Sequence, residues 1–159
     1  MPDIEYRESA GPIDEDKLLR LGALACQVFR VPGQPQPSAA GFAKHLGITV
    51  NGHEWVHLCV ASIDGELVGF KVGRSNDPRT FESWMGGVSP EARKRGIAAQ
   101  LARMQEAWCR DNGFQFIQTE TAHDNQAMLA VNLKEGFCIA GSYLDRGTNM
   151  KVILQKALK

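Results

Sequence analysis

The sequence predicts an α/β fold in one domain, and three observations carry this prediction. The chain has 159 residues, which is the size of one ordinary domain. Hydrophobic residues make up 43% and charged residues 23%, a composition that excludes disorder and a collagen-like structure. Segments with helical periodicity alternate with short β-rich segments in the order β-α-α-β-β-β-α-β-α-β-β, without an internal repeat. We therefore expect a mixed α/β layer structure that spans residues 1–159 as a single domain.

The first third of the chain is expected to form a short strand followed by two helices. Ile4 and Tyr6 alternate with charged residues, which is typical of a strand. Apolar residues then recur at helical spacing over residues 14–30. Three prolines and a glycine predict a loop at residues 31–38, and a weaker helix is expected at residues 39–46.

The centre of the chain is expected to form a hairpin and a third strand. Residues 55–62 and 67–74 are β-rich, and Asp64-Gly65 between them is a strong hairpin signal because type I′ turns need positive φ. The third strand is expected at residues 80–88. Within it, Gly86-Gly87 predicts either a bulge or a close approach by another backbone or a ligand.

The last part of the chain predicts two further helices among three strands. The clearest helix runs from Gly96 to Asn112, where apolar residues repeat at helical spacing, and Gly113 stands where a helix-ending glycine belongs. The remaining elements are expected at residues 114–121 (strand), 125–135 (helix), 137–144 (strand) and 150–158 (strand).

Charge and cysteine content narrow the functional classes. Lysine plus arginine and aspartate plus glutamate both total 18, so the overall charge attracts neither nucleic acid nor an anionic membrane. The four cysteines have no C-x-x-C spacing and no histidine at zinc-ligand spacing, so we predict no metal and favour reduced thiols over two disulfides. No apolar run has the length of a membrane helix or the character of a signal peptide. We expect a cytoplasmic protein.

One segment has the features of an anion site. A strand ends at Val88, a basic loop follows, and an amphipathic helix begins after Gly96. The first amides of a helix lack internal partners and carry partial positive charge, and small residues at Gly96 and Ala98 would let a phosphate approach them. The cations of the loop are Arg93, Lys94 and Arg95. The segment is neither a Walker loop nor a dinucleotide fingerprint. It predicts a pyrophosphate site, with a solvated basic turn as the alternative.

This segment resembles the acetyl-CoA-binding motif of the GNAT superfamily of N-acetyltransferases, Arg/Gln-x-x-Gly-x-Gly/Ala after a strand ending in Val-x-Pro. Arg93, Gly96 and Ala98 fill the motif, and Val88 and Pro90 precede it. A second stretch, Asn125-x-x-Met128-Leu129-x-x-Asn132-x-x-x-Gly136-Phe137, resembles the family's next motif at matching spacing. The resemblance covers about residues 55–158. It implies a GNAT-like fold, in which helices flank a central mixed, mostly antiparallel sheet.

The resemblance also implies acetyl-CoA as co-substrate. Pantetheine would lie along the third strand, with the Val88 N–H facing the thioester carbonyl, and the amides of residues 93–98 would hold the pyrophosphate. The residues implied to contact the cofactor are Met85, Gly86, Val88, Arg93, Lys94, Arg95, Gly96, Ile97, Ala98, Asn125 and Asn132.

Glu82 is the candidate general base, because several superfamily members carry a catalytic glutamate at this position. A substrate ammonium with a pKa near about 10.4 must lose a proton before it attacks a carbonyl. Strand alternation would put Glu82, Trp84 and Gly86 on one face, where partial desolvation would raise the pKa of the carboxyl. The alternative is a strand-end glutamate in solvent.

The leaving thiolate has no obvious acid. The family often has a tyrosine where this chain has Asn132, and an amide cannot be a general acid, although it can donate an N–H to sulfur. Tyr143 is the candidate substitute, with a packing role as the alternative.

These features predict an enzyme that transfers acetyl from acetyl-CoA to a primary amine of a small molecule, by direct attack in a ternary complex. The alternative is a protein that binds acyl-CoA as a sensor or interaction module without catalysis, and Asn132 is the residue that favours it. The loop at 31–38 is expected to border the acceptor opening. A homodimer is common among enzymes of this kind.

Overall fold

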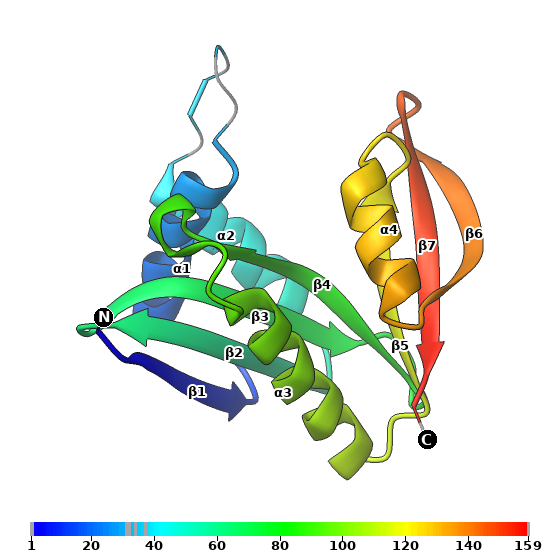
Figure 1. The fold of residues 1–159 in the computed structure, drawn as a ribbon, viewed down its shortest axis with the longest axis horizontal. Coiled ribbons are helices and arrows are strands. Elements are labelled where there is room, and N and C mark those ends of the chain that lie inside the picture. Colours follow the sequence, from blue (N-terminus) through cyan, green and yellow to red (C-terminus); the bar gives the residue numbers. More distant parts are fainter. Residues whose placement is uncertain (1, 31–32, 34, 37, 159) are drawn as a thin grey trace.

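The computed structural model describes residues 2–30, 33, 35, 36 and 38–158. Its elements follow the order expected from the sequence (Figure 1). The strands are β1 (Ile4–Ala10), β2 (Val56–Ile63), β3 (Glu66–Ser75), β4 (Thr80–Val88), β5 (Phe116–Ala122), β6 (Cys138–Asp145) and β7 (Asn149–Ala157). The helices are α1 (Glu15–Val28), α2 (Ala39–Val50), α3 (Ile97–Asp111) and α4 (Gln126–Lys134), with a 3-10 turn η1 (Pro90–Ala92) before α3. In the described part of the chain, no helix is long and apolar enough to cross a membrane.

The strands form one sheet in the order β1-β2-β3-β4-β5-β7-β6. Every neighbouring pair is antiparallel except β4 and β5, which are parallel. The prediction of a mixed, mostly antiparallel sheet flanked by helices is therefore confirmed. The second helix continues to Val50 rather than ending near Leu46, because its later residues also pack against the sheet.

Helices cover the β1–β4 part of the sheet on both faces. On one face, Leu24 of α1 and Leu46 of α2 pack with Phe70 of β3. On the other face, Leu101 of α3 packs with Ala61 of β2. Consecutive side chains of β2 and β3 point to opposite faces of the sheet, and each face has its own apolar layer. Most residues of these two strands are therefore at least partly buried.

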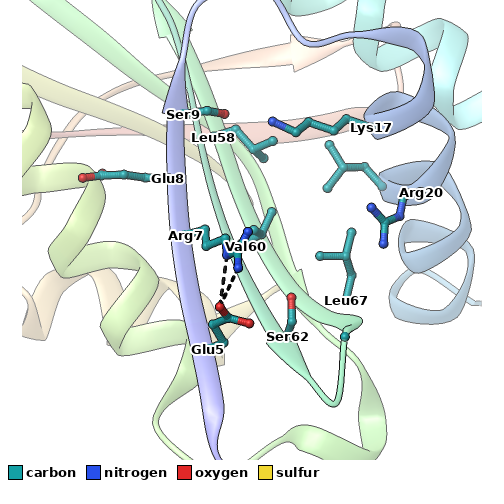
Figure 2. Close-up of a pocket in the computed structure, with 12 residues that line it drawn as sticks. Glu5, Arg7, Glu8, Ser9, Lys17, Arg20, Leu58, Val60, Ser62 and Leu67 are labelled. Atoms are coloured by element: carbon teal, nitrogen blue, oxygen red, sulfur yellow. Dashed lines mark hydrogen bonds and ion pairs between the residues drawn. The ribbon is translucent and has the colours of Figure 1, made fainter.

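A hollow of about 340 Å³ lies on the α1 face beside β1 (Figure 2). Lys17 and Arg20 of α1 border it, and Leu58 of β2 contributes to its apolar lining. Arg7 and Glu5 of β1 form an exposed ion pair of 2.7 Å at its edge. None of the site residues predicted from the sequence lines this hollow.

Strands β4 and β5 separate soon after they begin, which opens the sheet (Figure 1). They pair only at Thr80 with Phe116, Phe81 with Ile117, and Glu82 with Gln118. Just beyond the last pair, the Thr119 hydroxyl donates a hydrogen bond of 3.2 Å to the Ser83 carbonyl. The backbone of β4 from Ser83 onward therefore faces a cleft instead of a neighbouring strand.

A bulge in β4 lies close to this point of separation. Val72 of β3 pairs with Met85, but the next residue, Gly73, pairs with Ser83, so β4 contains one extra residue at Trp84. An extra residue bends a strand and increases its twist, which fits the divergence of β4 from β5. The sequence predicted a bulge at Gly86-Gly87 as one alternative. The bulge lies two residues earlier than Gly86, at Trp84, so that alternative is wrong.

The bulge also changes which side chains share a face. Trp84 and Met85 both pack against the α1 and α2 core, so the alternation is interrupted between them. Gly86 pairs with Lys71 and faces the α3 side. The prediction that Gly86 shares a face with Glu82 and Trp84 is therefore wrong, because the extra residue reverses the facing of every later position. A Cβ on Gly87 would collide with Val28 of α1, so what approaches Gly87 closely is a side chain, whereas the prediction named a backbone or a ligand.

The C-terminal strands β6 and β7 and helix α4 form a separate-looking arm beyond β5 (Figure 1). No residue of α4 is buried, and β6 is an edge strand whose residues are mostly exposed. Cys138, at the start of β6, is exposed, whereas Cys109 of α3 is buried.

Candidate active site

A cleft of about 870 Å³ occupies the space where β4 and β5 separate. Its walls are residues 83–88 of β4, residues 119–122 of β5, the loop and first turn of α3, and the start of α4. The predicted cofactor residues that line it are Met85, Gly86, Val88, Arg93, Lys94, Gly96, Ile97, Ala98 and Asn125. Two motifs far apart in the sequence therefore meet at one concave surface.

The N-terminus of α3 has the conformation of an anion site. Gly96 is the N-cap residue and has φ +79°, a left-handed conformation that favours glycine. No side chain caps the helix, so its first amides are available to a ligand. Lys94 is also left-handed, and turns of this kind turn successive amides toward one anion. Arg93 donates from Nε to the Val88 carbonyl at 3.1 Å, which fastens the loop to the end of β4.

Four residues predicted from the sequence are not among those that line the cleft: Glu82, Arg95, Asn132 and Tyr143. Arg95 points toward the N-terminal segment, where it donates to the Pro2 carbonyl at 3.1 Å. Asn132 of α4 donates to the Thr121 hydroxyl at 3.3 Å, and Thr121 does line the cleft. Asn125 caps α4 by accepting a hydrogen bond from the Met128 amide at 3.2 Å. Its side-chain NH₂ is not used in that cap.

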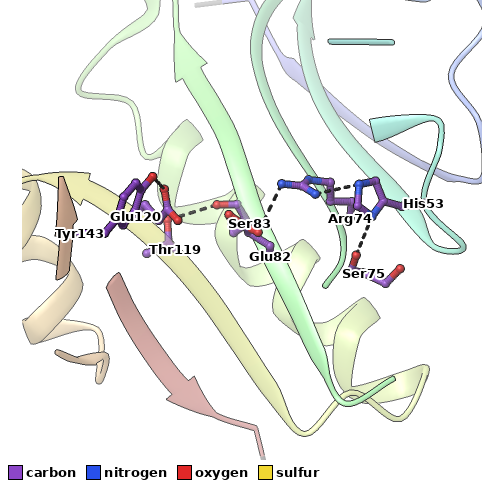
Figure 3. Close-up of polar contacts among 8 residues, drawn as sticks. All are labelled: His53, Arg74, Ser75, Glu82, Ser83, Thr119, Glu120 and Tyr143. Atoms are coloured by element: carbon purple, nitrogen blue, oxygen red, sulfur yellow. Dashed lines mark hydrogen bonds and ion pairs between the residues drawn. The ribbon is translucent and has the colours of Figure 1, made fainter. Parts of the chain in front are cut away.

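Glu82 lies at the last residue pair before the strands separate, and its side chain is only 9% exposed. The alternative of a strand-end glutamate in solvent is therefore wrong. Burial raises the pKa of Glu82, the positive charge of Arg74 lowers it, and the negative charge of Glu120 raises it further. The Arg74 Nη2 atom is 3.5 Å from the Glu82 Oε2 atom (Figure 3).

Arg74 is itself held by a histidine. His53 Nδ1 lies 3.0 Å from the Ser75 carbonyl, and His53 Nε2 lies 2.8 Å from Arg74 Nη1 (Figure 3). A carbonyl only accepts, so Nδ1 carries the proton and Nε2 accepts from the guanidinium. His53 thus orients Arg74 beside Glu82. His57 lies on β2 and contacts Glu8 instead.

Glu120 is a second carboxylate at the site, and the sequence reasoning missed it. It lines the cleft from β5 and accepts a hydrogen bond of 2.7 Å from the Tyr143 hydroxyl of β6 (Figure 3). This hydrogen bond is the main cause that raises the pKa of Tyr143 to about 12. A charged residue inside an otherwise uncharged strand segment was the signal that could have singled out Glu120.

The comparisons with known proteins identify the family. Residues 21–137 match the model of the family described as "Acetyltransferase (GNAT) family". The chain therefore belongs to the GNAT acetyltransferase family, whose co-substrate is acetyl-CoA. The uncapped N-terminus of α3, the β4 edge that β5 leaves free and the size of the cleft all fit acetyl-CoA.

Sequence similarity to a curated protein is confined to a short stretch. The chain is 45% identical over 51 residues to "Probable N-acetyltransferase HLS1" of Arabidopsis thaliana. That match covers 32% of this chain and spans only 12% of the length of the relative.

Three solved structures show the same fold at low sequence identity. The ribosomal-protein-S18-alanine N-acetyltransferase from Escherichia coli has a TM-score of 0.72 and 14% identity, over 96% of this chain and 95% of that one. An N-acetyltransferase from Staphylococcus aureus has a TM-score of 0.70 and 17% identity, over 96% and 99%. A GNAT family acetyltransferase from Elizabethkingia anophelis with acetyl-CoA bound has a TM-score of 0.63 and 17% identity, over 98% of both chains.

Proposed function

We propose that this chain is a single-domain N-acetyltransferase that moves acetyl from acetyl-CoA to a primary amine of a small molecule, by direct attack in a ternary complex. The observation that carries the proposal is the cleft between β4 and β5. There an uncapped helix N-terminus lies at one end, and the buried carboxylate Glu82 lies beside the point where the strands separate.

Acetyl-CoA supplies an activated acetyl thioester, and this chain supplies its binding groups. The amides of residues 96–98 would hold the pyrophosphate, with Arg93 and Lys94 adding positive charge. Residues 85–88 pair with β3 on one side only, and their free backbone edge would bind the pantetheine amides as a neighbouring strand would. The Val88 N–H would donate to the thioester carbonyl, where negative charge develops during attack.

Glu82 would accept the proton that the amine must lose. Its raised pKa makes it a stronger base than an exposed glutamate, while the positive charge of Arg74 favours the ionised form that can accept a proton. Glu120 would hold the incoming ammonium group, because it lines the cleft and its charge acts on Glu82, which lies next to the cleft-lining residue Ser83. The two carboxylates would then divide the work of binding and deprotonating the acceptor.

The thiolate would leave without a strong acid. A phenol with a pKa of about 12 is a poor proton donor to a thiolate, whose conjugate acid has a pKa near about 8.5. Tyr143 would therefore act by orienting Glu120. Asn132 would act through Thr121 rather than as an acid, since its amide donates to that hydroxyl.

A sensor that binds acyl-CoA without catalysis is the second candidate function, and the amide at Asn132 favours it. A cytoplasmic location and the absence of nucleic acid as a partner stay predictions of the sequence. The loop at residues 31–38 stays the proposed border of the acceptor opening, and its residues 31, 32, 34 and 37 lie outside those that the structure describes.

Thiol release from acetyl-CoA with a panel of amines tests the proposal, alongside a measurement of CoA binding. We expect at least one amine to stimulate release. We expect Arg93→Ala to weaken CoA binding about tenfold, because Arg93 fastens the loop and contributes charge. Arg103→Ala is the matched control, since Arg103 is an exposed arginine of α3 that bonds only Gln100.

The outcomes separate the candidates. CoA binding without turnover of any amine would favour the sensor. A chain that fails to bind CoA would contradict both functions.

A further inference from the structure

Three side chains with metal-ligating atoms converge on the α3 side of the sheet, away from the cleft. Glu8 belongs to β1, and His57 and Cys59 belong to β2. His57 Nε2 is 2.9 Å from Glu8 Oε2, and Cys59 Sγ is 3.9 Å from the same nitrogen. One ligand atom from each residue lies within 4.8 Å of the other two. We propose that Glu8, His57 and Cys59 bind a zinc ion.

The distances are close to those of a tetrahedral zinc site. Zinc bonds of about 2.0–2.1 Å to nitrogen or oxygen and about 2.3 Å to sulfur place N and O about 3.3 Å apart, and S and N about 3.6 Å apart. The ion would replace the hydrogen bond between Glu8 and His57, and Cys59 would turn about its Cα–Cβ bond toward Nε2. The thiol would release its proton to solvent and bind as thiolate. Nitrogen and sulfur ligands select zinc over magnesium or calcium.

Access and burial also suit such a site. His57 and Cys59 are fully buried, whereas the Glu8 side chain is 48% exposed. In Figure 2, Glu8 points away from the hollow toward the α3 side of β1. An ion can therefore reach the buried ligands from the edge of the sheet, past Glu8.

Gln105 of α3 provides a second, independent observation. Leu101 packs over the paired residues Gly69 and Ala61, and Trp108 stacks on His57 with ring centroids 4.4 Å apart. Gln105 stands between them on the helix, so it lies over the intervening pair, which contains Cys59.

The Gln105 side chain is fully buried, and among the described residues neither its Oε1 nor its Nε2 has a hydrogen-bond partner. Buried amides are normally paired, so an unpartnered one above this cluster indicates a missing ligand. The Gln105 carbonyl, or a water held by it, would complete the coordination. Burial and the negative charge of Glu8 raise the pKa of the Cys59 thiol to about 12, so the thiol would lose its proton only as the ion binds.

The ion would fasten the edge strand β1 to β2 beneath α3, a structural role that does not depend on the proposed transferase activity. The sequence could not reveal the site by spacing alone. Glu8 and His57 are 49 residues apart and meet only through the β1–β2 pairing.

Cobalt(II) titration of the full chain, freed of metal by a chelator, tests the site. We expect one ion per chain, a thiolate-to-cobalt charge-transfer band, and loss of the band when zinc is added. Cys59→Ser should abolish the band. Cys138→Ser, which removes an exposed thiol far along the chain, should leave it unchanged.

Glu8→Gln provides a variant that should keep its fold, because the side chain is half exposed. We expect it to bind cobalt at least about tenfold more weakly. Zinc should raise the unfolding temperature of the wild type and raise that of Glu8→Gln much less. Absence of the band in the wild type, or a band that survives Cys59→Ser, would overturn the proposal.

Discussion

The two largest influences on the pKa of Glu82 oppose each other: burial raises it, and the positive charge of Arg74 lowers it. Removing one of them should move the pH dependence of the enzyme in a known direction. Because Arg74 lowers the pKa, Arg74→Gln should raise it. The acid limb of the kcat/KM profile, which reports a base that must be deprotonated, should then move to higher pH.

Arg79→Gln is the control for that experiment. Arg79 is an exposed arginine in the turn between β3 and β4, and it is not among the groups that shift the pKa of Glu82. Its pH profile should match that of the wild type. An acid limb that stays in place in Arg74→Gln would remove Glu82 as the group that controls it.

The loss of kcat in Tyr143→Phe shows whether Tyr143 orients Glu120 or acts as a general acid. If the hydroxyl orients Glu120, Tyr143→Phe should lower kcat less than about tenfold, whereas loss of a general acid costs about 10²–10⁴-fold. Steady-state kinetics with one active amine measures this. A loss of several hundredfold would instead make Tyr143 the acid.

At the scale of the elements, the left-handed conformation of Gly96, the N-cap of α3, is expected to set the position of the amides that bind CoA. Gly96→Ala introduces a side chain at φ +79°, which costs about 1–2 kcal/mol of stability although the added Cβ has open space around it. We expect it to weaken CoA binding as well, because the first amides of α3 would change position. Thermal unfolding and CoA titration measure the two effects.

Gly113→Ala is a matched control at the other end of the same helix, with φ +81° and equally open surroundings. It should lose similar stability and keep its CoA affinity. Equal loss of affinity in both variants would mean that the α3 N-terminus has no special role.

The elements themselves could be predicted from the sequence because local residues specify where they end. Gly113 and Gly136 are left-handed at helix ends, and Asp64-Gly65 forms the hairpin turn. The bulge at Trp84 could not be predicted, because it is a matter of register between β3 and β4. Strand pairing depends on the whole sheet. The extra residue at Trp84 also places Gly86 on the opposite face from the one predicted.

The same limit holds for the candidate site: its local features could be predicted, and its contacts between strands could not. The loop motif singled out Gly96 and its neighbours because an anion site at a helix terminus is local in the sequence. The contacts of Glu82 with Arg74, and of Tyr143 with Glu120, join different strands and needed the structure. Glu82 itself was predicted from the family resemblance, and its burial only from the fold.

At the scale of the whole molecule, the exposed apolar residues of the C-terminal arm predict an interface with a second copy. Most of them lie on α4 and on β6, the edge strand of the sheet in the described part of the chain. Those of large size are Met128, Val131, Leu133, Ile139, Tyr143, Leu144 and Met150. Apolar edge strands of this kind pair readily with another chain.

Sedimentation at increasing protein concentration tests this interface. We expect a dimer for the wild type, and dissociation for Ile139→Lys, which puts a charge on the apolar surface of β6. Ile48→Lys is the control, because Ile48 of α2 is even more exposed, at 72%, and lies away from the arm. A wild type that stays monomeric would contradict the interface.

If Glu82 deprotonates the amine, its carboxylate should be needed for turnover and not for CoA binding. The most direct test is amine-dependent thiol release by Glu82→Gln and the wild type, with CoA binding measured on both. The account predicts a loss of about 10²–10⁴-fold in kcat with CoA affinity nearly unchanged. Turnover by Glu82→Gln close to that of the wild type would contradict it.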